Sequence, residues 1–171
     1  MNIDKKEHII NLFEHWFSYG PKNRAAISVN DDGGVSFVGS CKLKYSMPDR
    51  VLPLTFEKIH GEFNCSDSNL TSLEGSPRIV NASFLAHNNP LQSLNDLPDS
   101  ARYIKISYSQ DLPLLRLLFV KNLGKIAFYP YTPEGDQVNQ ILSKYLGKGR
   151  GGALACAAEL ARAGFNRNAR K

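Results

Sequence analysis

The sequence predicts an α/β repeat fold: a solenoid of about five rungs with a short parallel sheet, an N-terminal capping helix and a C-terminal helical appendage. Three observations predict it. Apolar or small residues recur in pairs, two positions apart, every 20 to 22 residues; segments 63–77 and 84–98 share one layout; helical periodicity is confined to the two ends. Evenly spaced strands are typical of a coil in which every turn adds one strand to a shared sheet. We therefore expect a helix-capped solenoid, 1–131, followed by a basic helical segment, 132–171.

The segment 4–19 is expected to form an amphipathic helix. Its apolar residues recur at spacings of three and four: Ile9, Leu12, Phe13, Trp16 and Phe17. Gly20 and Pro21 are expected to end the helix. The end rung of a solenoid would otherwise expose its core and a free strand edge, so this helix is assigned to cover it.

The repeat begins after a turn at 30–34, which separates two short expected strands at 26–29 and 35–38. The paired residues then follow: Cys41/Leu43, Phe63/Cys65, Phe84/Ala86, Ile104/Ile106 and Ile126/Phe128. Alternate residues of a strand share a face, so we expect each pair to point into the core.

Leucines complete the repeat "FNCSDSNLTSLEGSP" at 63–77. Leu70 and Leu73 are three residues apart on the returning segment and are expected to fill the same core. The small polar residues 66–69 lie where the chain bends away from the strand, and an asparagine in such a bend can satisfy backbone groups of the neighbouring turn. The leucines are therefore assigned a structural role.

These motifs resemble leucine-rich repeat proteins, most closely a group of short ones carried by tailed bacteriophages and prophages. The resemblance rests on "SVNDDGGVSFVGSCKL", on "ILSKYLGKGRGGALACAAELARAGFNRNAR" and most specifically on "LPLTFEKIHGEFNCSDSNLTSLEGSP" at 52–77. After Pro98 the segment "ARYIKISYSQDLPLL" keeps only the skeleton A-x-x-I-x-I-x-x-S, and it also resembles the L-P-x-x-L repeat subtype of secreted bacterial effectors. The resemblance implies a fold and a phage genome, and it carries over no common activity.

The C-terminal segment is expected to begin with a helix. Thr132 is a suitable N-cap, Pro133 suits the first helical position, and Gly147 ends the pattern. An apolar stripe marks its packed face: Val138, Ile141, Leu142 and Tyr145.

A second, alanine-rich helix is expected at 153–165, closed by Gly164. The glycine-rich stretch "GKGRGG" at 147–152 is interpreted as a flexible hinge between the two helices. Residues 166–171 form a basic polar tail that has no reason to be ordered alone.

The composition is that of an ordinary globular domain, with 42% hydrophobic and 22% charged residues among 171. No apolar run approaches the ~18 residues of a membrane span, and the N-terminus lacks the order of a signal peptide, so a cytoplasmic location is expected, in the host cell if a phage encodes the chain. The cysteines (Cys41, Cys65 and Cys156) and the four histidines show no disulfide or metal-ligand spacing. We expect no metal.

The sequence offers no catalytic constellation. "GKGRGG" lacks the pattern G-x-x-x-x-G-K-[ST] and follows a predicted helix, so a hinge is preferred to a nucleotide site, although weak contact with a nucleic-acid backbone stays open. Cys156 lies among alanines, where a free cysteine is usually a small buried hydrophobe, and no local histidine or acid would activate it. We predict a protein that is not an enzyme and has no cofactor.

The strand residues that alternate with the inward pairs would form the concave face that solenoids use for binding. We assign partner binding to eight of them: Glu62, Asn64, Leu85, His87, Tyr103, Lys105, Lys125 and Tyr129. Amphipathic aromatics beside an apolar residue resemble the anchors of protein interfaces. The alternative is a solvated sheet face, or one that a terminal helix covers.

The positive charge is concentrated at the C-terminus. The net charge is +5, and residues 144–171 hold seven basic residues against one acid, Glu159. Six of these are candidates for contact with an anion or a nucleic acid: Lys144, Lys148, Arg150, Arg162, Arg167 and Arg170. Attachment to a membrane surface is a weaker alternative, since the second helix is too alanine-rich to bury much apolar area.

The hypothesis we prefer is a non-enzymatic interaction protein that binds a host protein, in order to inhibit or redirect it in host takeover or anti-defence. A nucleic-acid-associated protein is the alternative. Self-association is a further expectation, because an apolar end rung needs cover from the C-terminal helices or from a second copy.

Overall fold

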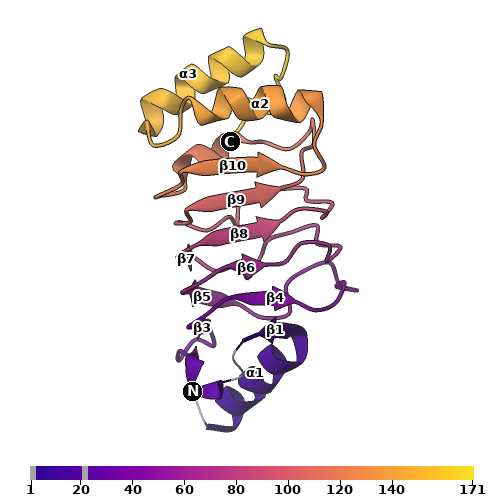
Figure 1. The fold of residues 1–171 in the computed structure, drawn as a ribbon, viewed down its shortest axis with the longest axis vertical. Helices are drawn as coiled ribbons and strands as arrows, with labels where there is room; N and C mark the ends of the chain where they lie inside the picture. Colours follow the sequence, from indigo (N-terminus) through magenta and orange to yellow (C-terminus); the bar gives the residue numbers. More distant parts are fainter. Residues whose placement is uncertain (1–2, 21–22) are drawn as a thin grey trace.

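The computed structural model describes residues 3–20 and 23–171, which form a β-solenoid of about four turns flanked by helices. The turns stack along one axis, with the first helix at the N-terminal end and two further helices at the C-terminal end (Figure 1). Across these two ranges, no helix has the length and apolar character needed to cross a membrane.

The first sheet runs the length of the solenoid. Its strands are, in spatial order, β1 (Phe17–Tyr19), β4 (Cys41–Leu43), β6 (Phe63–Asn64), β8 (Ser83–Ala86), β9 (Tyr103–Ile106) and β10 (Lys125–Phe128). β1 is antiparallel to β4, and all later pairs are parallel. The predicted inward pairs are confirmed, since every member is buried except Phe128, which is half-buried.

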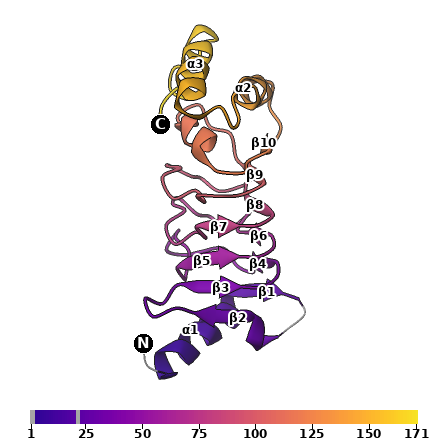
Figure 2. The same cartoon turned by 90° about the vertical axis from the view of Figure 1, so that its left-hand side faces the viewer.

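A second sheet lies behind the first, so each central turn contributes two strands, whereas one was expected (Figure 2). Its strands are β2 (Ile27–Val29), β3 (Val35–Phe37), β5 (Phe56–Ile59) and β7 (Ile79–Val80). Isolated bridges continue the pairing from Ile79 to Ser100 and on to Lys121. Because both sides of the solenoid are sheets, neighbouring turns are separated by the same strand-to-strand distance on each side. The column is therefore nearly straight in both views, and we correct the predicted concave face to an outer face.

The core fills the space between the two sheets. A group of buried phenylalanines occupies its N-terminal half: Phe13, Phe17, Phe37, Phe56, Phe63 and Phe84. The ring centroids of Phe63 and Phe84 are 5.8 Å apart in a stacked arrangement, and those of Phe56 and Phe63 are 5.1 Å apart, edge to face. Leu70 and Leu73 are buried in the same cluster, which confirms their predicted structural role.

The N-terminal cap combines a helix with a strand. α1 spans Ile3–Trp16, and β1 follows at once, so the predicted helix 4–19 is three residues too long. Phe17–Tyr19 instead pairs with the edge of β4 because that edge would otherwise be unpaired. Pro21, expected to end the helix, lies outside the described residues. A 3₁₀ turn, η1 (Arg24–Ala26), then leads into β2.

The C-terminal end is covered by helices that pack against β10 and against the 3₁₀ segment η2 (Leu115–Phe119). α2 spans Pro133–Ser143 and begins as predicted, because the Thr132 hydroxyl accepts a hydrogen bond from Gly135 N at 3.0 Å. α3 spans Gly149–Arg162. The predicted hinge 147–152 is therefore corrected, since its last four residues form the first turn of α3.

The basic tail after α3 is ordered, which corrects the expectation for 166–171. Gly164 closes the helix at a φ of +91°, with Phe165 N donating to Leu160 O at 2.8 Å. The chain then returns to the solenoid, where Asn168 is buried and Leu114 N donates to its carbonyl at 3.1 Å. The tail is therefore part of the cap on the last turn.

Candidate interaction face

The predicted partner-binding residues lie on the side of the first sheet that faces away from the core. We call this side the outer face. Parallel pairing aligns one row across five strands: Lys42, Asn64, Leu85, Lys105 and Ala127. A second row aligns Ser83, Tyr103 and Lys125. Figure 1 looks onto this sheet, and among the described elements no helix lies over β6, β8 and β9.

The predicted residues differ in exposure. Lys125 and Tyr129 are exposed, and the other six are half-buried: Glu62, Asn64, Leu85, His87, Tyr103 and Lys105. The structure therefore places all eight at the surface of one sheet. Asn64 also has a structural role, because its Oδ1 accepts hydrogen bonds from Ser66 N at 3.1 Å and from Ser66 Oγ at 2.5 Å. It thereby fixes the bend after β6.

Cations and aromatic rings are interleaved at the β9–β10 end of the outer face. Lys105 Nζ lies 4.5 Å from the centroid of the Tyr129 ring, and His87 meets the same ring edge to face at 5.1 Å. Lys125 Nζ is 5.8 Å from the centroid of Tyr103. Such contacts hold long side chains in place and reduce the conformational entropy that a partner would have to remove.

The surroundings of His87 favour its neutral form. Its Nδ1 is buried without a hydrogen-bond partner among the described residues. Partial burial lowers the pKa of His87 below its ordinary value of 6.5, and Lys105 and, to a smaller extent, Lys42 lower it further, against an opposing effect of Asp67. The imidazole and Tyr129 therefore form an uncharged patch beside Lys105.

We expect the stability of the protein to fall on acidification partly through His87. A histidine whose pKa is lowered in the fold stabilises the protein fully above its unfolded value of 6.5, and this contribution is lost as the pH falls through the folded value. Urea midpoints measured between pH 7.5 and 5.5 should therefore decrease less in His87→Gln than in the wild type. Equal decreases in both proteins would contradict the assignment.

Most of the predicted C-terminal cations make contacts within the chain. Lys144 forms an ion pair with Glu159 at 2.5 Å, and Lys148 lies over the Tyr145 ring at 5.3 Å. Arg167 pairs with Asp111, and Arg170 donates to the carbonyls of Arg167 and Asp111 at 2.9 and 3.1 Å.

Arg150 and Arg162 are exposed on α3, and Arg162 helps to lower the pKa of Glu159 after the hydrogen bonds from Lys144 and Tyr145. Four of the six predicted anion contacts thus form two groups: Lys144 and Arg162 act on Glu159, and Arg167 and Arg170 contact Asp111.

The thiols lie in surroundings that suppress reactivity. Burial raises the pKa of Cys156 to about 11 and that of Cys65 to about 12, and it raises that of Cys41 as well. Thiolate, the nucleophilic form, is therefore scarce at neutral pH. No group of three or more metal-ligating side chains occurs in the part of the chain that the structure describes.

An aromatic cluster that the sequence analysis did not predict lies beside the outer face, where α1 meets β1. The centroid of the Trp16 ring is 4.9 Å from that of His15 and 6.0 Å from that of Tyr45, and both rings are close to perpendicular to Trp16. Tyr45 is exposed and Trp16 is half-buried. No periodic signal identified Tyr45, because it follows β4 in a segment where the repeat is irregular.

Comparisons with protein-family models, with curated proteins and with solved structures found no match to this chain. Its function must therefore be argued from the outer face itself.

Proposed function

We propose that this chain is a non-enzymatic interaction module that binds a host protein through the outer face. We also propose that it is a short leucine-rich repeat protein of phage origin, which inhibits or redirects its host target in the host cytoplasm. The observation that carries the interaction role is the arrangement of Leu85, His87 and Tyr129 beside lysines on a sheet that the described helices leave uncovered. Aromatic and aliphatic anchors of this kind are typical of binding hot spots.

The leucine-rich repeat assignment is supported by the motif at 52–77 and by the buried leucines of each turn. The alternative role, binding of nucleic acid through the C-terminal segment, is less favoured. Arg167 and Lys144 already form ion pairs with Asp111 and Glu159, so contacts with phosphate would have to replace them.

The test is a double substitution in the outer face, Leu85→Asp with Tyr103→Ala. Tagged protein is incubated with nuclease-treated host lysate, retained proteins are identified by mass spectrometry, and the affinity of a purified candidate is then measured. We expect the double variant to bind that protein at least about 30-fold more weakly, because truncating a hot spot costs about 2 kcal/mol or more.

The matched control changes the same residue types elsewhere. Tyr131 and Leu154 are 73% and 75% exposed, on the segment before α2 and on α3 respectively. Tyr131→Ala with Leu154→Asp should leave the affinity within about twofold. Equal affinity of both double variants would remove the outer face as the binding site. Loss of all retained proteins after nuclease treatment would instead favour the nucleic-acid role.

A further inference from the structure

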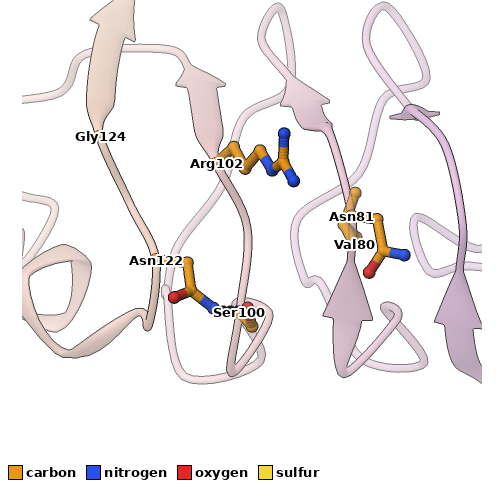
Figure 3. A pocket seen from close by; sticks show the side chains of 6 residues that line it. All are labelled: Val80, Asn81, Ser100, Arg102, Asn122 and Gly124. Atoms are coloured by element: carbon orange, nitrogen blue, oxygen red, sulfur yellow. Dashed lines mark hydrogen bonds between the residues drawn. The ribbon is translucent and has the colours of Figure 1, made fainter.

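A polar pocket lies at the corner where the chain passes from the second sheet to the first, away from the outer face. It is open and measures about 650 Å³. Figure 3 shows the residues that line it: Val80, Asn81, Ser100, Arg102, Asn122 and Gly124. They come from three successive turns, so the stacking of the repeat brings them together.

Arg102 is the one large side chain in the backbone ladder at this corner. Arg102 N donates to Ala82 O and Gly124 N donates to Arg102 O, both at 3.0 Å, so small residues lie on either side of the arginine. A Cβ on Gly124 would meet only the Arg102 carbonyl oxygen, at 3.7 Å. In Figure 3 the Arg102 side chain reaches toward the turn that carries Asn81. The guanidinium is therefore left open to a ligand.

The charge at this corner is positive and uncompensated. The lining of the pocket includes no acidic residue, and within residues 3–20 and 23–171 no carboxylate lies within ion-pair distance of Arg102. The acid nearest in sequence, Asp99, is taken by Arg78 at 3.1 Å. Lys121, which is exposed, adjoins Asn122 in sequence, whereas the Lys125 ammonium lies on the outer face, 5.8 Å from the centroid of the Tyr103 ring.

We propose that this corner pocket binds the phosphate monoester group of a small molecule, with Arg102 as its principal ligand. A guanidinium presents two parallel N–H donors that match two phosphate oxygens, and it is favoured wherever such bidentate recognition is needed. Asn122 Nδ2 donates to Ser100 Oγ at 3.0 Å, which fixes the amide at the edge of the pocket. Asn81 also lines the pocket. A cation that no acid faces attracts a dianion more strongly than a monoanion.

The test is a titration of the ¹⁵N-labelled full chain with phenyl phosphate, followed by amide chemical shifts at constant ionic strength. We expect saturable shifts at Asn81, Arg102, Asn122 and Gly124. Arg102→Gln should weaken the affinity at least tenfold, and Arg102→Lys, which keeps the charge and loses the fork, at least threefold. Arg50→Gln removes the same charge from an exposed position between β4 and β5 and should leave the affinity within twofold.

Several results would overturn the proposal. One is the absence of saturable shifts at the pocket, and another is an affinity that Arg102→Gln leaves unchanged. Dimethyl phosphate or acetate binding as tightly as phenyl phosphate would show that the pocket does not select a monoester dianion. Because Arg102 is exposed and its side chain makes no hydrogen bond or ion pair with described residues, each variant is expected to fold, and none of these outcomes depends on the outer face.

Discussion

Replacing Asn89 with alanine is expected to lower the free energy of unfolding by about 3 kcal/mol or more, because several buried backbone groups would lose their partner at about 1–3 kcal/mol each. Asn89 lies in the bend after β8 and is 4% exposed. Its Oδ1 accepts from Ser68 N and Leu70 N at 3.1 and 2.9 Å, and its Nδ2 donates to Cys65 O and Ala86 O at 2.8 and 3.0 Å. One side chain thus joins two successive turns.

The measurement is equilibrium unfolding in urea for the wild type and for Asn89→Ala. Asn95→Ala is the matched control, since Asn95 is an exposed asparagine in the same repeat and its side chain makes no hydrogen bond with described residues that the structure shows. The control should change the free energy of unfolding by less than about 0.5 kcal/mol. A similar small change for Asn89→Ala would mean that water replaces the lost hydrogen bonds.

The kind of contact that Asn89 makes could be predicted from the repeat, but its position could not. The polar bend at 66–69 indicated that an asparagine would bond to a neighbouring turn. Ser68 occupies the equivalent place 21 residues before Asn89, and its shorter hydroxyl reaches only as far as Ser66 O, at 3.0 Å. The layout of the repeat identifies the bend, whereas the length of the side chain in the bend decides whether that side chain reaches the neighbouring turn.

The first sheet could be predicted because its inward pairs alternate with polar residues, as in Phe84 and Ala86 around Leu85. The second sheet could not. Its strands are two to four residues long, and β7 has only Ile79 and Val80, too few for alternation to appear. Its signal was the spacing of 21 residues that links Val35 with Phe56 and Ile59 with Val80, which matches their pairing in one turn and the next.

The outer face followed from alternation alone, but its contacts required the register between strands. Leu85 and Lys105 could be assigned outward from their own strands. That Lys105 reaches the Tyr129 ring depends on how β9 lies against β10, which no single repeat encodes. Arg102 was missed for a related reason. It lies at a corner where the alternation pauses, and its importance comes from the small residues of the adjacent turns.

The basic tail was misread because composition was the only guide to it. Charged and polar residues at a chain end are usually poorly ordered unless something ties them down. Here a single buried residue, Asn168, holds the tail in place, and its neighbours in sequence are exposed or half-buried. Nothing in the local pattern distinguishes Asn168 from Asn166, and only the open end of the last turn explains why one of them is buried.

Asn168→Ala is therefore expected to release the tail and to lower the free energy of unfolding by about 2–3 kcal/mol, through the loss of bonds to buried groups. Asn168 Nδ2 donates to the carbonyls of Ser109 and Leu112 at 2.9 and 2.8 Å, and its Oδ1 accepts from the Tyr108 hydroxyl at 3.2 Å. Asn166→Ala, at an exposed position two residues away, is the matched control and should change the stability by less than about 0.5 kcal/mol.

Hydrogen exchange distinguishes release of the tail from general destabilisation. Leu114 N and Leu115 N donate to the carbonyls of Asn168 and Arg170 at 3.1 and 3.0 Å, so the tail itself protects these two amides. In Asn168→Ala these two amides should exchange much faster. The amides of β8 and β9 should exchange faster only by the amount that the loss of global stability explains. If Leu114 and Leu115 kept their protection, the tail would be held by the contacts of Arg167 and Arg170 with Asp111 instead.

Release of the tail would also free the side chains of Arg167 and Arg170 from Asp111. Nucleic-acid binding by Asn168→Ala but not by the wild type would therefore show that the ordered tail masks the positive charge of the C-terminal segment.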